Sequence, residues 1–383
     1  LARERSAPTP AIRLGTGALA SAAIAALALA FIAVLDRGFL TVAIALTALG
    51  TAFVAGRLDI PALRYVVAAV GIAVLGRLAW DPLIMSGGPG SGLIVNWLLV
   101  GYGLPALAFW GAVRLLRTGG DDAALRISES LAVLFTALLG LMQIRHAFHG
   151  PKMLTAEPTH AEVGLMLVTG LAFSATLTRL GGLDRSPVFR VASILLACLT
   201  AAGGLLTLAI FANPLLVPHP VRGPAIASSL AIAYAVPALA ALVMKEVAAG
   251  RRPAWFVRAM GILAVVLAFA YVTLEVRHLF QGADIRIWRT TGDAEMWAYS
   301  AAWLALGVAF LAWGVLRGSK EARLASLVVV VIAVLKVFLA DLADLRGIWR
   351  PLSLIGLGLV LLGIALVYQR LVFAHPRRPA PPP

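Results

Sequence analysis

The sequence predicts an all-α, polytopic integral membrane protein with about twelve transmembrane helices, and its composition is the first reason. Hydrophobic residues make up 61% of the 383 residues and charged residues only 13%, against roughly 45–50% and about 25% in soluble domains. Apolar runs of about 20 residues recur along the chain, and this length lets a helix cross a hydrocarbon core. A helix also satisfies its own backbone groups in lipid.

The elements follow from these runs in chain order. Residues 1–10 are predicted to be a charged linker, and 374–383 a Pro-rich cytoplasmic tail. Because the sequence has no initiator Met, we expect either a fragment of a longer protein or a protein whose start has been removed. Twelve candidate spans lie between the two ends, at residues 14–35, 39–56, 62–80, 93–116, 127–147, 162–180, 190–212, 224–245, 257–279, 296–316, 323–341 and 352–373.

An internal repeat is the second observation. The pattern Arg-His-x-Phe-x-Gly occurs at residues 145–150 and again 132 residues later at 277–282, each time at the end of an apolar run. Asp81-Pro82 and Asn213-Pro214 keep the same period. We therefore expect three four-helix repeat units, at 11–118, 123–250 and 255–373. An even number of spans in each unit makes the repeats parallel.

The distribution of Lys and Arg predicts the orientation. Of the 32 basic residues, 21 lie at the two ends and in the loops after the even-numbered spans. Because basic loops stay in the cytoplasm, both termini are expected there, in a bacterial inner membrane. The net charge of +14 therefore reflects topology, and no nucleic-acid partner is predicted. Both Arg-His motifs are expected to face the extracytoplasmic side.

The motif residues are the first candidates for a substrate site. Glu275, Arg277 and His278 end one span, and Arg145 and His146 lie at the matching places of another. Ionisable groups near the hydrocarbon edge are costly, which favours a function. The alternative is that Arg and His reach the headgroups and cap their helices. The recurrence of the whole pattern favours function, because capping alone would accept other residues.

The last spans add further candidates. Lys336 lies in an apolar span five residues before Asp341, and Arg350 follows in the next predicted loop. An ion pair that merely neutralises Lys336 and Asp341 is the alternative to a substrate role. Pro105 and Pro237 lie inside two spans at the repeat period, where they are expected to kink the helices.

Metal and cofactor chemistry has little support in the sequence. His146, His149, His160 and Glu162 could hold zinc, but the second motif has Gln281 in place of His149. No phosphate-binding loop or dinucleotide fingerprint is present. We therefore predict neither a metal nor a cofactor.

The chain resembles a bacterial family of polytopic membrane proteins known as domain of unknown function 2339. The resemblance rests on three stretches, namely residues 96–106, residues 274–282, and the segment from Lys336 through Arg350 and Ser353 to Arg370. Pro351 departs from the apolar residue expected there, and the first Arg-His motif is an imperfect copy. The resemblance implies a helical membrane fold and brings no activity with it.

Three functions remain open. The leading hypothesis is a transporter-like protein that handles an anionic, envelope-related small molecule or lipid-linked substrate at an extracytoplasmic-facing site. An alternative is a membrane-embedded enzyme that modifies a lipid or lipid-linked glycan, with His278 or Glu275 as general acid–base. The third is a structural or assembly role among membrane lipids and neighbouring proteins. The sequence does not decide whether the protein is an enzyme.

Overall fold

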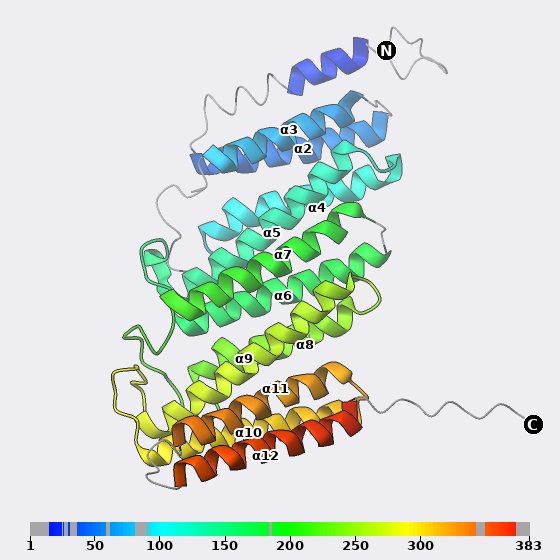
Figure 1. Cartoon of the computed structure of the whole chain (residues 1–383). Helices are drawn as coiled ribbons and strands as arrows, with labels where there is room; N and C mark the ends of the chain where they lie inside the picture. Colours follow the sequence, from blue (N-terminus) through cyan, green and yellow to red (C-terminus); the bar gives the residue numbers. More distant parts are fainter. Residues whose placement is uncertain are drawn as a thin grey trace, which may run out of the picture. The chain divides into compact units, whose positions relative to one another are not determined.

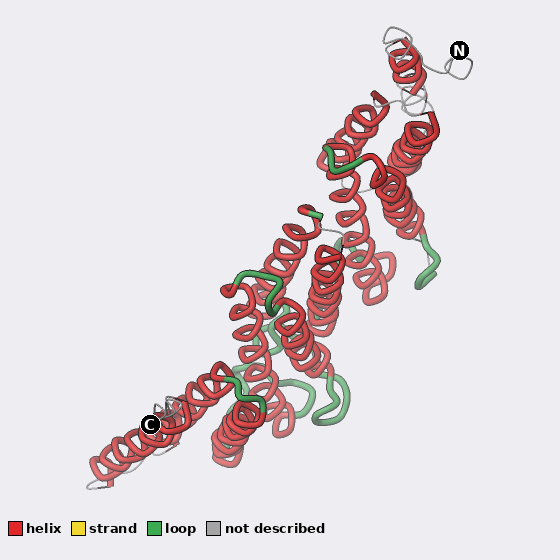
Figure 2. The backbone as a smooth tube through the Cα atoms, turned by 90° about the vertical axis from the view of Figure 1, so that its right-hand side faces the viewer, coloured by secondary structure: helices red, strands yellow, loops and turns green. Residues whose placement is uncertain are grey.

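A computed structural model describes residues 15–24, 37–58, 62–80, 92–183, 186–341 and 349–372, together with positions 26, 30 and 90. Helices and loops make up these residues, with no strand among them (Figures 1 and 2). The predicted linker (1–10), the whole predicted C-terminal tail (374–383), Asp81 and Pro82 lie outside the described residues. The all-α fold predicted from the sequence is confirmed.

The helices follow the predicted spans closely. After a short helix at Gly15–Ile24, the α-helices are α2 (Arg37–Leu58), α3 (Ala62–Trp80), α4 (Leu104–Leu116), α5 (Ala123–His149), α6 (His160–Leu183), α7 (Pro187–Leu206), α8 (Val236–Ala248), α9 (Ala254–Gln281), α10 (Asp293–Leu316), α11 (Lys320–Lys336) and α12 (Trp349–Val372). Short 3₁₀-helices occur at η2 (Arg117–Gly119) and η3 (Gly150–Lys152).

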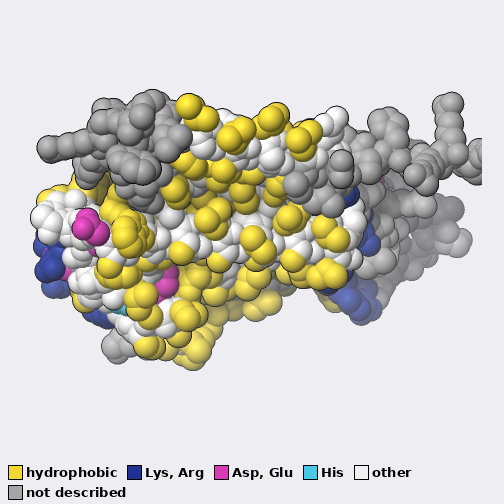
Figure 3. All heavy atoms as spheres, turned by 60° about the horizontal axis from the view of Figure 1, so that its bottom comes forward, with side chains coloured by type: hydrophobic (Ala, Val, Ile, Leu, Met, Phe, Trp, Pro, Cys, Tyr) yellow, Lys and Arg dark blue, Asp and Glu magenta, His cyan; other side chains and the backbone are white. Residues whose placement is uncertain are grey.

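Ten helical segments in the described part of the chain are long and apolar enough to cross a membrane, and two shorter apolar helices accompany them. In the face that Figure 3 shows, hydrophobic side chains cover the middle, while Lys and Arg gather toward the ends. Such an apolar belt is what lipid requires of a spanning helix. The chain is therefore a polytopic membrane protein.

Among the residues that the structure describes, four π-helical turns interrupt the spans. Two of them, η1 (Leu99–Gly103) and η5 (Ala231–Ala235), directly precede α4 and α8. The other two, η4 (Thr207–Phe211) and η6 (Val337–Asp341), directly follow α7 and α11. A π-turn is rare and often marks a functional position.

The two prolines predicted to kink spans lie just after the first pair of π-turns. Pro105 and Pro237 are each the second residue of their α-helix. The amide of the residue before each proline closes the π-turn, as Leu104 N does on Leu99 O. Proline has no N–H to continue the helical ladder. The wider turn accommodates this missing donor while the backbone stays helical.

Spans 4 and 8 begin later than predicted. Their helical turns start at Trp97 and Ser229, and not at residues 93 and 224. The residues before them form irregular segments because side chains there bind the backbone. Asn96 Oδ1 accepts hydrogen bonds from Leu98 N at 3.0 Å and Leu99 N at 3.3 Å. Leu230 N donates to Ser228 Oγ at 3.1 Å.

The chain forms two compact units. The first comprises Leu1–Pro158, Leu165–Gly204 and Val247–Arg251. Within it, α2 packs on α3 and α4, and α5 packs on α3 and α4. Phe109 and Phe135, both fully buried, stack at 6.0 Å between their ring centroids. The division into three four-helix repeat units stays a prediction. Helix α5, the first helix of the predicted second repeat unit, packs on α3 and α4 of the predicted first repeat unit.

The second compact unit comprises Thr159–Gly164, Leu205–Glu246 and Arg252–Pro383. Here α10 packs against α11 most extensively, and α9 packs against α10. A Cβ on Gly307 would lie 2.5 Å from a methyl group of Val330, so only glycine allows this approach. The Ser326 hydroxyl donates to Gly307 O at 2.5 Å and contacts Tyr368 Oη at 2.6 Å. A buried hydrogen bond of this kind joins the helices in the absence of a hydrophobic driving force.

Candidate functional site

Each Arg-His motif ends a long helix at its glycine. Gly150 follows α5 with φ of 55°, and Gly282 follows α9 with φ of 71°. The amide of each glycine donates to the carbonyl of the motif histidine, His146 or His278. Only glycine adopts positive φ without strain. The last position of the motif is therefore fixed by the helix C-terminus.

The motif histidines bridge two loops by their ring nitrogens. His146 Nδ1 lies 3.2 Å from Gly150 O, and its Nε2 lies 3.1 Å from Gly92 O. His278 Nδ1 lies 2.8 Å from Gly282 O, and its Nε2 lies 3.2 Å from Gly223 O. Carbonyl oxygens only accept, so both nitrogens donate at once only in the imidazolium form. Each ring thus ties the turn after its helix to the irregular segment before a π-turn.

The residue two positions before each motif arginine holds the same irregular segment. Gln143 accepts a hydrogen bond from Asn96 Nδ2 at 2.8 Å and donates to Ile94 O at 3.0 Å. At the matching positions 132 residues later, Ser228 replaces Asn96 and Glu275 replaces Gln143. Glu275 accepts hydrogen bonds from Ser228 Oγ and from Ile226 N, both at 2.8 Å. The second copy therefore replaces a neutral amide by a carboxylate.

Ile226 adopts a strained backbone. Its φ is 72°, and it is the one non-glycine residue with positive φ among the residues that the structure describes. A β-branched residue in this region is an outlier. Two side chains of α9 hold it there: Glu275 accepts from its amide, and Tyr271 Oη donates to its carbonyl at 2.7 Å. The Ile226 side chain is 77% exposed.

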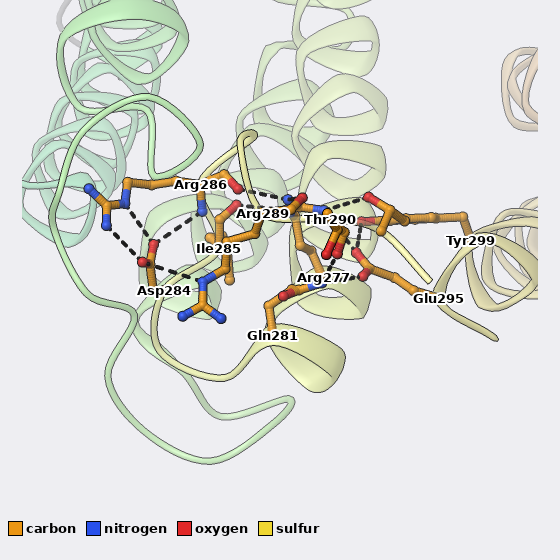
Figure 4. A network of polar contacts seen from close by, with 10 residues as sticks. Arg277, Gln281, Asp284, Ile285, Arg286, Arg289, Thr290, Glu295 and Tyr299 are labelled. Carbon is orange, nitrogen blue, oxygen red and sulfur yellow. Dashed lines mark hydrogen bonds and ion pairs between the residues drawn. The ribbon is translucent and has the colours of Figure 1, made fainter. Parts of the chain in front are cut away.

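Arg277 uses every N–H group it has (Figure 4). Its Nε donates to Ile285 O at 2.7 Å, and its Nη2 donates to Arg286 O at 2.7 Å and Arg289 O at 3.0 Å. Its Nη1 donates to Glu295 Oε1 at 2.9 Å and Thr291 Oγ1 at 3.2 Å. A guanidinium has five N–H donors. These five contacts account for all of them.

Glu295, the third residue of α10, is the buried acid in this network. It is 1% exposed, and Arg277 beside it is 6% exposed. Its carboxylate also accepts from Gln281 Nε2 at 2.6 Å and Tyr299 Oη at 2.9 Å. A buried ion pair is tolerated only when hydrogen bonds satisfy both partners. The arrangement meets that condition.

The α9–α10 connection, residues 283–292, wraps around Arg277 and presents other charges outward. Asp284 receives two hydrogen bonds at 2.8 Å from Arg286, and Arg289 lies 3.5 Å from the same carboxylate. The hydrogen bonds from Arg286 hold the pKa of Asp284 well below its usual range. Figure 4 shows Asp284 and Arg286 on one side of Arg277, with Glu295 and Tyr299 on the other. Arg286 lies 5.1 Å over the ring of Trp288.

This connection is also tied to the α7–α8 connection, residues 212–230. Val221 N donates to Ala283 O at 2.9 Å, and Ile287 N donates to Leu215 O at 3.0 Å. Together the two connections form the loop pair, residues 212–230 and 283–292. A cavity of about 180 Å³ is lined by one residue of each connection, Leu215 and Ile287, and by Arg277 of α9 and Tyr299 of α10.

The other predicted site residues have separate surroundings. Arg145, in the first compact unit, donates to Ala156 O at 2.5 Å. Lys336 lies against α10, where its ammonium donates to Met296 O and to Ser300 Oγ, the latter at 2.9 Å. Asp341 and Arg350 have helical backbones, and their side chains lie outside the described residues. Asp344 and Arg346 lie outside them altogether.

A metal centre finds no support in the described part of the chain, where no three His, Cys, Asp or Glu side chains are placed to hold an ion. His160, one of the residues that the sequence offered for zinc, instead lies 2.7 Å from Ser229 Oγ through Nε2. Glu162 accepts a hydrogen bond from Thr159 N at 3.2 Å, as an acid in a helix N-terminal capping box does.

A family model described as "Predicted membrane protein (DUF2339)" matches residues 1–371, which is nearly the whole chain. The chain belongs to the DUF2339 family. The resemblance noted in the sequence is thereby confirmed. No curated protein and no solved structure matches the chain.

For this DUF2339 member, sequence reasoning missed three residues of the second motif's surroundings. Glu295 was overlooked because acids are common in the first turn of a helix, where the dipole favours them. The sequence signal that could have identified Glu295 is a carboxylate at the start of an apolar span. Tyr271 and Ile226 gave no signal, since neither a hydroxyl contact across loops nor a backbone angle is visible in sequence.

Proposed function

We propose that the chain is a multi-span scaffold protein of its membrane, which binds an anionic component of the cell envelope on the rigid loop pair. The observation that carries this proposal is the fold of residues 283–292 around Arg277. All five donors of this guanidinium are used within the chain. Arg277 therefore holds the backbone of the α9–α10 connection in place, and other residues of that connection contact the partner.

A substrate-binding arginine needs donors that a ligand can take. A ligand anion at Arg277 would have to displace the Glu295 carboxylate or three backbone carbonyls. Glu295, which is 1% exposed, would keep its hydrogen bonds from Gln281 and Tyr299 but lose its cation, and loss of a hydrogen bond to a charged group costs about 1.5–3 kcal/mol. This cost favours a structural role for Arg277 over direct binding.

The outward side of the loop pair has the chemistry for an anionic partner. The Arg286 and Arg289 side chains are 31% and 48% exposed, and they share one carboxylate, that of Asp284. One positive charge is thus in excess. Trp288 is 61% exposed, and tryptophan is enriched where lipid meets water. Arginine matches phosphate oxygens in pairs, so a phosphate-bearing headgroup suits this surface.

Thermal unfolding in nanodiscs tests the proposal. The purified chain is compared in phosphatidylcholine discs and in discs that also contain anionic phosphatidylglycerol. We expect a higher Tm with phosphatidylglycerol, and loss of this gain in the double variant Arg286→Gln/Arg289→Gln. The matched control is Arg317→Gln, because Arg317 also lies over an exposed tryptophan, Trp313, at 4.8 Å. An equal gain in the double variant would contradict the proposal.

Transport of an anionic envelope substrate is the second candidate. The cavity beside Arg277 favours it, but its volume of about 180 Å³ is below the roughly 300–1,000 Å³ of typical ligand pockets. If this candidate holds, a soluble anion such as glycerol phosphate stabilises the wild type, and Arg277→Ala abolishes that stabilisation. The enzyme hypothesis lacks a supporting contact, because Glu275 and His278 each bind loop groups of the chain itself.

A further inference from the structure

A second polar site lies at the other end of α5 from Arg145 and His146. A cavity of about 410 Å³ opens between the α4–α5 connection and the start of α7, and it is lined by Arg117, Asp121, Leu125, Glu129, Ser186 and Pro187, among others. Ligand pockets typically have volumes of roughly 300–1,000 Å³. The Lys and Arg distribution predicts this end to be cytoplasmic. The cavity is independent of the scaffold function proposed above.

Glu129 is the most buried charged group at this cavity. Its side chain is 3% exposed, and its Oε2 accepts a hydrogen bond from Ser186 Oγ at 2.6 Å. Its Oε1 lies 3.5 Å from Arg117 Nη2, at the limit of a hydrogen bond. A carboxylate offers about four acceptor sites. Glu129 therefore keeps acceptor capacity on the side of Arg117.

Arg117 has a second contact besides this carboxylate. Its guanidinium carbon lies 5.7 Å from the centre of the Phe189 ring, over its face. An arginine on an aromatic face gains about 0.5–1 kcal/mol at exposed sites. The side chain is 35% exposed. A buried carboxylate thus faces a cation that is held partly elsewhere.

Two carboxylates line the cavity, and one of them has a cation of its own. Asp121 lines it as a second carboxylate and receives two hydrogen bonds at 2.9 Å from Arg126. These bonds hold the pKa of Asp121 below its usual range, so it is ionised at neutral pH. Among the lining side chains named above, two carboxylates stand against one guanidinium. Because Asp121 already pairs with Arg126 and Arg117 lies 3.5 Å from Glu129, the buried carboxylate of Glu129 is the group that favours a cationic ligand.

We propose that this cavity binds a primary ammonium group on a short carbon chain, with Glu129 as its acceptor. A primary ammonium supplies three N–H donors from a compact charge. Its donors match the open acceptor sites of Glu129, and Leu125 and Pro187 offer apolar contact to the attached carbons. Two sources share this chemistry, a free small amine and the headgroup of an aminophospholipid.

Thermal unfolding of the full chain in phosphatidylcholine nanodiscs tests the site, with ethanolamine as the soluble probe. We expect a saturable rise in Tm with ethanolamine for a free-amine site, or a rise only on adding phosphatidylethanolamine for a lipid site. Glu129→Gln should weaken either response at least tenfold. The control Glu246→Gln removes an exposed carboxylate of α8 and should leave the response unchanged.

A ligand-side control keeps the test decisive if Glu129→Gln does not fold. Choline is a quaternary ammonium with the same charge and no N–H donor, so the wild type should respond to it at least tenfold more weakly than to ethanolamine. Equal responses to choline and ethanolamine would overturn the proposal. So would the absence of a saturable response to both ethanolamine and phosphatidylethanolamine.

Discussion

The two Arg-His motifs share one skeleton and differ in charge. In both, a histidine joins the glycine after the helix to a carbonyl of an earlier loop. In both, the side chain two residues before the arginine holds an isoleucine backbone, at Ile94 or Ile226. The first copy uses neutral Gln143, whereas the second uses Glu275. The shared part is therefore architecture, and the charged part is specific to the second copy.

The arginines show the same contrast. Arg277 holds the backbone of residues 285–289 and pairs with buried Glu295. Arg145 donates to the carbonyl of Ala156, in the first compact unit. Position 152, which matches Asp284 at the repeat period, is Lys152. A single motif can thus support loops of different charge.

Removal of Arg277 should have the largest effect. Arg277→Ala leaves Glu295 buried without its cation, which costs about 3–5 kcal/mol. Arg145→Ala should lose less, about 1–3 kcal/mol for a charged hydrogen bond. Denaturant unfolding in detergent micelles measures both. Equal losses in the free energy of unfolding would show that the two arginines stabilise the fold to the same extent, which would contradict the difference described between the two motifs.

Exchange of the residues at 143 and 275 should have the next largest effect. Glu275→Gln loses charged acceptance from Ile226 N and Ser228 Oγ, so we expect a loss of about 1–3 kcal/mol. The reverse change, Gln143→Glu, removes the donor to Ile94 O and should cost about 0.5–1.5 kcal/mol. The same unfolding assay applies. A neutral Glu275→Gln variant would mean that the carboxylate is not needed to hold Ile226.

The backbone of Ile226 predicts a gain in stability. Ile226→Gly relieves the left-handed conformation, whose penalty is about 1–2 kcal/mol for an L-residue. Part of this gain is offset by the added freedom of glycine when unfolded, so we expect a net increase near 1 kcal/mol. Ile94→Gly is the matched control and should give no increase. Destabilisation by Ile226→Gly to the same extent as Ile94→Gly would argue against strain at this position.

Acid should have the smallest effect, on the outer part of the second loop. The pKa of Asp284 is lowered in the folded chain, first by the hydrogen bonds from Arg286. Its contribution to loop order is therefore present above the usual aspartate value of about 3.9 and is lost as the pH falls toward the lowered value. Hydrogen exchange of residues 283–292 reports this loss. Asp284→Asn should show the acid behaviour already at neutral pH.

The sequence predicted much of the architecture because lipid restricts it. Apolar runs gave the helices, and the repeat located both motifs at helix ends. The starts of spans 4 and 8 were wrong because Leu93, Ile94 and Val95 read as helix by hydropathy. In the structure they lie in an irregular segment that Asn96 caps. A side chain that binds its own backbone leaves no trace in hydropathy.

The chemistry was harder to predict, and the reason lies in partners distant in sequence. Arg277 was expected to offer its charge to a ligand, yet Glu295, on the next helix, takes part of it. Glu129 was not among the candidates from the sequence, and its hydrogen-bond partner Ser186 lies 57 positions further along the chain. Pairing of this kind appears only once the helices are packed.

Hydrogen exchange at the loop pair tests the structural role of Arg277 most directly. The amides of Val221 and Ile287 join the two connections and should exchange slowly in the wild type. Arg277→Lys keeps the charge but loses the planar fork, so exchange at both amides should become at least tenfold faster, while the middle of α9 stays protected. Unchanged exchange, or protection that appears only when an anion is added, would contradict the account.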